Sequence, residues 1–373
     1  MNAPAPEPRR ATPARIVADG EVAVGRFDRP FPTANLDEAP ARHLLSRLRG
    51  GPLGPLEQAW KRLRLKQWHY ASVAGPGLFL GAVVFDAGYV GVGFAYVVDR
   101  ASGAVREWSK MVPLARGIAI APNSTDGTSR FAARGFGEIT FGNDGASGRR
   151  TLRIDLAARG ATPALEVDLV MDEAPGAIEP VIAVGELEPG RWLYTHKAYG
   201  LPAGGTIRAG DWSARWSPGE AMAGLDWNRG FRLTETYWNW AAAAGRDRKG
   251  RPVGFTFTSH VPPPGSRYPT PSHDSANDSA VWLDGKVADL ANVHFHYDPG
   301  NIMAPWRIYT DDGTVELEFQ PLGERVEDLD LKLIVSRFHQ PFGRFRGTLR
   351  GAGGEVHELD DVFGVTEEHF ARW

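Results

Sequence analysis

The chain contains no cysteine among its 373 residues. Disulfide bonds, thiolate metal sites and cysteine nucleophiles are therefore excluded. It also lacks any apolar run near the roughly 20 residues that a membrane-spanning helix requires. Residues 1–15 are rich in Pro, Ala and Arg and lack the apolar segment of a secretory signal. From these absences we expect a cytoplasmic protein without stable membrane insertion.

Strong net charge is missing as well, since the formal charge is only -3. Such a composition offers no polyanion-binding face, so we expect no nucleic-acid partner. The sequence contains no phosphate-binding loop, no dinucleotide fingerprint before a helix, no GxSxG and no HExxH, and no cofactor is predicted. His294 and His296 would face the same way on a strand, but two histidines without a third ligand do not predict a metal site.

Glycine and proline, by contrast, are abundant, with 44 and 28 residues. These counts are high for a helical protein and fit many short strands joined by turns. Apolar runs such as Leu78–Phe85 and Tyr89–Val98 follow one another across short turns, and strands so closely connected must pair antiparallel. The Asp284-Gly285 and Asp312-Gly313 dipeptides are typical of tight hairpins. We therefore predict an all-β fold.

Two successive series of strands indicate two domains. Residues 1–20 are expected to form a flexible arm, 21–190 a first antiparallel β-barrel and 191–373 a second. Short helices are predicted before the main strands, at Ala41–Leu48 and at Pro55–Leu65. The second of these rests on apolar residues that recur at helical spacing.

The stretch Tyr237-Trp-Asn-Trp240 combines three aromatic side chains with one amide. On a strand, Tyr237 and Asn239 share one face, and Trp238 and Trp240 share the other. The four residues are candidates for a cavity wall with one orienting amide, because ligand pockets are mostly apolar with few polar groups. The alternative is a structural core in which the buried amide and the ring donors find partners.

The candidate catalytic residues are Asp86, Tyr89, Asp278 and His339. Asp86 and Tyr89 follow a very apolar strand, and a carboxylate beside a dry cavity would have a raised pKa and could donate a proton. The alternative for Asp86 is a turn residue that bonds its own backbone. Asp278, at the end of a long irregular segment, is either a general acid or a solvated loop residue. His339 is either a proton carrier or a buried structural histidine.

Eight segments, in order along the chain, together resemble one family. They are Lys66-Gln-Trp68 with Tyr70, Phe85-Asp-Ala-Gly-Tyr89, Pro113-Leu-Ala-Arg-Gly117, Tyr237-Trp-Asn-Trp240, Trp282-Leu-Asp-Gly285, Pro305-Trp-Arg307, His339-Gln-Pro-Phe-Gly343 and Gly364-Val-Thr-Glu-Glu-His-Phe-Ala-Arg-Trp373. From about Asp19 to its last residue, the chain is similar to the bacterial and lower-eukaryotic family known as domain of unknown function 2804. Trp68, Tyr70 and Trp282, which lie in these segments, are further candidates for ligand binding.

The resemblance implies a fold and a type of function. The family is similar in architecture to proteins with two lipocalin-like barrels in tandem, such as carotenoid hydratase, tocopherol cyclase, the AttH-like proteins and fungal Diels–Alderases. It therefore implies an apolar cavity at or between barrels and no cofactor. It also implies one or two acids or hydrogen-bond donors that act on a polyene or isoprenoid.

Three functions stay open at this point. The expected one is a cofactor-independent acid–base enzyme of the hydratase, isomerase or cyclase type, which binds a small hydrophobic molecule in a barrel cavity. The second is a non-catalytic carrier or sensor of a lipid-like ligand. The third is a carbohydrate-active protein that uses Trp stacking and paired carboxylates. No oligomeric state is predicted.

Overall fold

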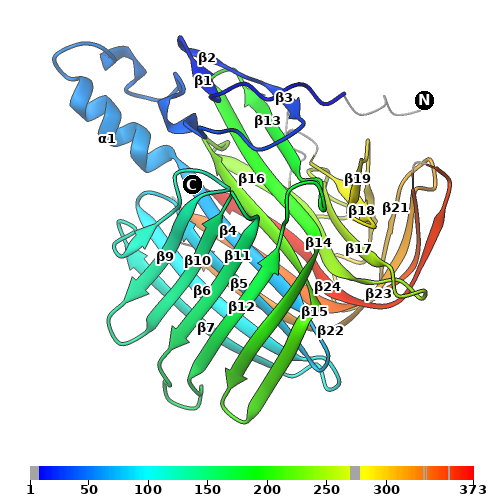
Figure 1. The fold of residues 1–373 in the computed structure, drawn as a ribbon. Helices are drawn as coiled ribbons and strands as arrows, with labels where there is room; N and C mark the ends of the chain where they lie inside the picture. Colours follow the sequence, from blue (N-terminus) through cyan, green and yellow to red (C-terminus); the bar gives the residue numbers. More distant parts are fainter. Residues whose placement is uncertain (1–7, 269–277, 331, 333, 352) are drawn as a thin grey trace.

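The computed structural model describes residues 8–268, 278–330, 332, 334–351 and 353–373. Nearly all of its regular structure is antiparallel β-sheet, which confirms the expected all-β fold with two tandem antiparallel units. The two large sheets curl side by side (Figure 1).

The first sheet has thirteen strands in the hydrogen-bonded order β7-β6-β5-β4-β15-β14-β12-β11-β10-β9-β8, with β13 paired to β14 and to β3. Its strands are β3 (Gly25–Phe27), β4 (Lys66–Ala74), β5 (Leu78–Asp86), β6 (Val90–Asp99), β7 (Val105–Pro113), β8 (Ile118–Ala119), β9 (Gly127–Ala133), β10 (Gly137–Asp144), β11 (Arg149–Leu156), β12 (Leu165–Asp172), β13 (Val181–Glu188), β14 (Arg191–Ala209) and β15 (Trp212–Gly230).

The second sheet has nine strands in the order β19-β18-β17-β16-β24-β23-β22-β21-β20. Its strands are β16 (Glu235–Arg246), β17 (Pro252–Ser259), β18 (Ala280–Leu283), β19 (Lys286–Asp289), β20 (His294–His296), β21 (Trp306–Tyr309), β22 (Val315–Asp330), β23 (Val335–Arg350) and β24 (Val356–Arg372). Among the described residues, no pairing joins β7 to β8 or β19 to β20, so each sheet is a curled half-barrel. A separate pair, β1 (Val17–Ala18) and β2 (Glu21–Val22), lies near the N-terminus.

The burial pattern along the strands explains the curled shape. In β11 and β12 buried residues alternate with more exposed ones, so one face of each strand points into the first sheet and the other into solvent. Strand β5 is buried along nearly its whole length. One of its faces packs inside the first sheet, and the other faces the second sheet. Burial on both faces agrees with the uninterrupted apolar run at Leu78–Phe85.

The interior of each sheet is filled by side chains. Phe131 and Phe141 are buried inside the first sheet. A Cβ added at Gly93 would lie 2.4 Å from the ring of Phe131, so glycine permits the close approach of β6 to β9. Phe255 and Trp306 belong to the buried cluster of the second sheet. A ligand-sized space is found instead between the two sheets.

The boundary between the two units lies later in the chain than expected. The long hairpin of β14 and β15, which we expected to open the second unit, pairs with β12 and β4 of the first sheet. The chain crosses to the second sheet between Gly230 and Glu235. The two strands of this hairpin pair with each other over 19-residue lengths, and this length lets them serve both the first sheet and its contact with the second.

The N-terminal segment 8–20, expected to belong to a flexible arm, packs onto the body of the protein. Ile16 and Val17 are buried in a cluster with Phe27 and Leu36. Burial of this apolar pair explains why the segment is ordered against the body and is not a flexible arm. The pair is hard to recognise in the sequence because Pro, Ala and Arg residues surround it.

The two predicted helices have different outcomes. The segment Ala41–Leu48 contains the 3-10 helix η2 (Ser46–Leu48), preceded by η1 (Leu36–Glu38), instead of an α-helix. The prediction at Pro55–Leu65 is confirmed by α1 (Gly54–Arg64). In Figure 1, α1 lies at the upper left, and its C-terminal end leads directly into β4 of the first sheet.

Candidate active site

A cavity of about 230 Å³ lies between the two sheets. The first sheet contributes β4 to β7, β14 and β15 to its wall, and the second contributes β16, β17 and β22 to β24. Because strand side chains alternate, the residues of β4, β5 and β6 that face the cavity point away from the interior of the first sheet. The volume lies below the usual range of small-molecule pockets, about 300–1,000 Å³, which favours a compact ligand.

Most of the wall is aromatic or aliphatic. The apolar lining comprises Trp68, Tyr70, Val83, Phe85, Ala87, Tyr89, Val90, Val92, Phe94, Met111, Leu193, Trp238, Trp240, Leu329, Ile334, Val335, Phe338 and Trp373. Such a surface excludes water and suits an apolar guest with π-faces to contact.

One end of this wall carries a buried ionic triad. Lys197 Nζ lies 3.3 Å from Asp226 Oδ2 and 2.7 Å from Asp278 Oδ2, and all three side chains are at least nine-tenths buried. Lys197 and Asp226 are direct cross-strand partners in β14 and β15, and Asp278 lies two residues before the start of β18. Asn228, two residues after Asp226 on β15, donates a short hydrogen bond to the Asp226 carboxylate.

The surroundings push the pKa values of the two carboxyl groups in opposite directions. Burial raises the pKa of Asp226, and the negative charge of Asp278 adds to the rise, while Lys197 offsets part of it. Burial also acts to raise the pKa of Asp278, but the Lys197 ammonium outweighs it and leaves this pKa lowered. A carboxyl pair split in this way supplies one acid and one base at the same place.

Arg232, in the connection between the two sheets, extends over the aromatic wall. Its guanidinium carbon lies 4.4 Å from the ring centre of Trp68 and 5.2 Å from that of Trp238. Burial lowers the pKa of Arg232 to about 10, so it stays protonated at neutral pH. The charge of Arg232 acts on Asp226 and Asp278 as well, which keeps the polar end of the cavity close to neutral overall.

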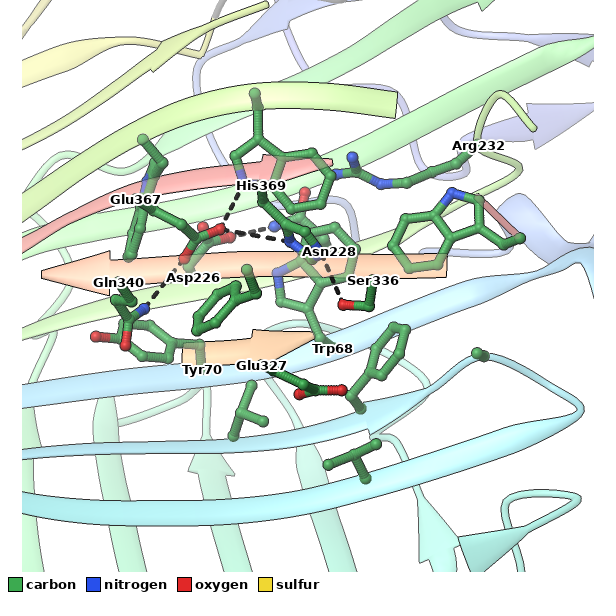
Figure 2. Close-up of a pocket in the computed structure, with 18 of the residues that line it drawn as sticks. Trp68, Tyr70, Asp226, Asn228, Arg232, Glu327, Ser336, Gln340, Glu367 and His369 are labelled. Carbon is green, nitrogen blue, oxygen red and sulfur yellow. Dashed lines mark hydrogen bonds and ion pairs between the residues drawn. The ribbon is translucent and has the colours of Figure 1, made fainter. Parts of the chain in front are cut away.

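A second polar group of side chains lines the cavity from the second sheet (Figure 2). Glu367 accepts hydrogen bonds from Trp238 Nε1 at 2.6 Å and from Gln340 Nε2 at 3.1 Å. His369 Nε2 lies 3.0 Å from Ser336 Oγ. The cavity thus has a triad of charged groups and, from β24 of the second sheet, a carboxylate and a histidine that are each hydrogen-bonded to neighbouring side chains.

Six of the candidates from the sequence come together on this wall: Trp68, Tyr70, Tyr89, Trp238, Trp240 and Asp278. Asp86 and His339 are not among the lining residues. Asp86 Oδ1 accepts the Gly88 backbone N–H at 2.7 Å, the turn geometry considered above as the alternative. His339 Nδ1 lies 3.1 Å from Glu324 Oε2, on the face of β23 opposite Phe338 and Gln340.

Tyr237 and Asn239 lie on the other face of β16, inside the second sheet. Tyr237 Oη donates to Asn239 Oδ1 at 3.0 Å, and Asn239 Nδ2 donates to Tyr297 Oη at 2.9 Å. The amide is therefore satisfied by protein groups. Trp282 is likewise buried, and its Nε1 donates to the Glu179 carbonyl at 2.6 Å. None of these three side chains lines the cavity.

Sequence reasoning missed Lys197, Asp226, Asn228 and Arg232. The sequence does contain a signal for the first three. Lys197 is a charged residue in the middle of a largely apolar strand, and Asp226 and Asn228 are two residues apart on the next strand. Both patterns place polar groups on a buried face. His294 pairs with Asp311 at 3.0 Å. Among the described residues, no group of three or more side chains that could hold a metal ion is found.

Residues 38–373 match the family described as Domain of unknown function (DUF2804). The chain belongs to this family. The DUF2804 match includes every strand of the two large sheets except β3, and it includes all residues of the cavity wall. Curated proteins contain no match.

Three solved structures are similar in fold to this DUF2804 protein. A protein described as an AttH from Nitrosomonas europaea shares 14% identity at a TM-score of 0.48, covering 82% of this chain and 92% of its own. CghA shares 11% identity at a TM-score of 0.46, covering 83% and 88%. Kievitone hydratase from Nectria haematococca shares 8% identity at a TM-score of 0.45, covering 83% and 88%.

No helix in the described ranges is both long enough and apolar enough to cross a bilayer.

Proposed function

We propose that this DUF2804 protein is a cofactor-independent acid–base enzyme of the hydratase, isomerase or cyclase type. Its substrate is a small isoprenoid, polyene or lipid-like molecule held in the cavity between the sheets. The observation that carries the proposal is the pair of buried carboxyl groups that share Lys197 at one end of an apolar cavity.

Asp226 is the proposed general acid. Protonation of a carbon–carbon double bond needs an acid that keeps its proton near neutral pH, and burial raises the pKa of Asp226 in that direction. The proton moves from the Asp226 carboxyl to one carbon and leaves a positive charge on the other. Trp68, Trp238 and Trp240 line the same space, and aromatic rings stabilise a cation through their quadrupoles.

Asp278 is the proposed base. Lys197 keeps its carboxylate ionised, because the ammonium lies 2.7 Å away and outweighs the effect of burial. In a hydration, Asp278 accepts a proton from the water that adds to the cationic carbon. In an isomerisation or cyclisation, it removes a proton from a neighbouring carbon, which regenerates a double bond. The proton taken up by Asp278 then returns to Asp226, so either course restores both carboxyl groups to their starting protonation states.

The test uses deuterium as a label for proton transfer to carbon. The protein is incubated in D₂O with a panel of isoprenoids and conjugated polyenes, and the recovered compounds are analysed by mass spectrometry. We expect carbon-bound deuterium in at least one compound, and a loss of about hundredfold or more in Asp226→Asn and Asp278→Asn, the scale of general acid–base catalysis. Each variant keeps one carboxylate beside Lys197 and is therefore expected to fold.

The matched control is Asp144→Asn, since Asp144 caps an exposed turn through Ser147, and it should incorporate deuterium at the normal rate. Full incorporation in both cavity variants would refute the assigned roles. Tight binding of panel compounds without any incorporation would assign the cavity to a carrier or sensor instead, and native mass spectrometry of the gently purified protein measures that binding directly.

A further inference from the structure

The helix α1 has an inverted polarity. Leu53, Leu56 and Trp60 at its start and along its length are 50%, 57% and 36% exposed, whereas Glu57 and Lys61 are buried. A helix on the surface of a soluble protein normally turns its apolar stripe inward and its charged residues outward. The opposite arrangement leaves an apolar face without a covering partner in this chain's described structure.

The inward charged face is firmly held. Glu57 Oε1 lies 3.0 Å from both Arg49 Nη2 and His43 Nε2, and Lys61 Nζ lies 5.7 Å from the ring centre of Phe231. A rotation of the helix that buried its apolar face would break this buried ion pair, at a high cost in free energy. The outward direction of the apolar residues is therefore a fixed property of the fold.

Leu53, Leu56 and Trp60 recur at spacings of three and four residues along one side of the helix, and together with the exposed Leu44 of the preceding segment we call them the outer patch. Leu44 is the most exposed of them, at 80%. Among the described residues, these four are the only exposed large apolar side chains between Gly25 and Tyr89. Clustering of this kind marks an interaction surface, whereas singly scattered apolar residues do not.

The exposed charged residues of the segment between Ala41 and Leu65 are basic. Arg42, Arg47 and Arg62 are exposed, and the one acidic residue between Ala41 and Leu65 is Glu57, which is buried and paired. Trp and Leu on one side of a short helix, bordered by exposed arginines, match the pattern of helices that lie in the interface of anionic bilayers. We propose that the outer patch docks this protein on the surface of an anionic lipid bilayer.

The position of α1 connects this surface to the cavity. Arg64 Nη1 donates to the carbonyl of Trp373 at 2.7 Å, and Lys66 Nζ donates to the carbonyls of Leu63 at 2.9 Å and Ala87 at 2.8 Å. Ala87 and Trp373 both line the cavity. The C-terminal end of the docking helix thus rests on the cavity wall, and docking brings that end of the cavity beside the layer from which an apolar molecule can enter.

The test is flotation of the full chain with lipid vesicles in a density gradient. The chain is expected to float with vesicles of equal parts phosphatidylcholine and phosphatidylglycerol, and to stay at the bottom with vesicles of phosphatidylcholine alone. Added salt is expected to weaken the binding, because the arginines act through charge. Arg47→Gln and Arg62→Gln should each reduce binding roughly fivefold. The double variant Leu56→Gln with Trp60→Gln should reduce it about a hundredfold.

The matched control is Val326→Gln on β22 of the second sheet. The exposed fraction of Val326, 54%, is similar to that of Leu56, but Val326 lies outside the outer patch. It should bind vesicles as the wild type does. Equal binding of the wild type and the double variant would overturn the proposal. So would a dimer of the wild type in solution that the double variant dissociates, since this result would assign the outer patch to a second copy of the chain.

The result is independent of the proposed catalysis. Proton transfer to a soluble short-chain compound, measured without vesicles, is expected to be unchanged in the double variant, since neither Leu56 nor Trp60 lines the cavity. Flotation of the catalytic variant Asp226→Asn is expected to be normal.

Discussion

At the scale of single residues, the ion pairs buried inside the first sheet determine the response to acid. Glu173 Oε2 lies 2.5 Å from Arg150 Nη2, and Glu173 Oε1 lies 2.7 Å from His196 Nε2. Burial acts to raise the pKa of Glu173, but Arg150 and His196 outweigh it and lower the pKa to about 2. A carboxyl group with a lowered folded pKa stabilises the protein above its ordinary pKa and loses that contribution as the pH falls.

We therefore expect the free energy of unfolding, measured with urea, to fall by a few kcal/mol as the pH is lowered from about 5 towards 2. Glu173→Gln leaves the buried Arg150 without its anion and should lower the free energy of unfolding at neutral pH by about 3–5 kcal/mol. It should also flatten the dependence on pH. Glu138→Gln, which breaks an exposed pair with Arg130, should change the stability by less than about 1 kcal/mol. A pH dependence in Glu173→Gln as steep as that of the wild type would contradict the assignment.

Individual site residues differ in how far the sequence predicts them. Alternation along one strand is a local property, and it correctly separated Trp238 and Trp240 from Tyr237 and Asn239. The pairing of Lys197 with Asp226 is not local. If the pairing register at the Ala209–Trp212 end of the hairpin continued unchanged, Lys197 would not lie opposite Asp226. Two irregularities in the pairing of β14 with β15 shift the register and place the two residues opposite each other.

At the scale of elements, backbone makes a close contact between the two sheets. A Cβ added at Gly254 of β17 would lie 2.6 Å from the backbone nitrogen of Gly200 and 2.6 Å from the carbonyl carbon of Tyr199 in β14. Both neighbours are main-chain atoms, which cannot move aside as a flexible side chain can. We expect Gly254→Ala to lower the free energy of unfolding by about 1–3 kcal/mol through overpacking.

Thermal and urea denaturation measure this change. Gly54→Ala at the start of α1 is the control, since an added Cβ there meets nothing within 4 Å, and it should be neutral or slightly stabilising. An unchanged stability in Gly254→Ala would show that the two strands separate more easily than their distance indicates.

Most elements were predictable because they depend on short patterns. Dense apolar runs and tight turns predicted antiparallel strands, and helical spacing predicted α1. The sequence did not predict which side of α1 faces the body of the protein. That orientation is determined by the buried ion pairs of Glu57 with Arg49 and His43. The assignment of the β14–β15 hairpin to the first sheet depends on long-range pairing with β12 and β4, for which the sequence contains no local signal.

At the scale of the whole molecule, the two sheets share one buried cluster. That cluster includes Tyr70 and Tyr199 of the first sheet together with Trp240, Trp282 and Phe363 of the second. Neither sheet can therefore unfold without exposing apolar surface of the other. We expect a single cooperative transition in guanidinium, with tryptophan fluorescence and far-ultraviolet circular dichroism changing at the same concentration. Two separated transitions would show that the sheets are independent folding units.

The location of the cavity between the outer faces of two packed half-barrels has a consequence for how such proteins can diversify. Replacing a wall residue such as Val92 or Met111 alters the shape offered to a guest without disturbing the packing inside either half-barrel. The cavity can therefore change its ligand with little loss of stability. A cavity between two half-barrels can thus evolve new specificities while the structure of each half-barrel stays the same.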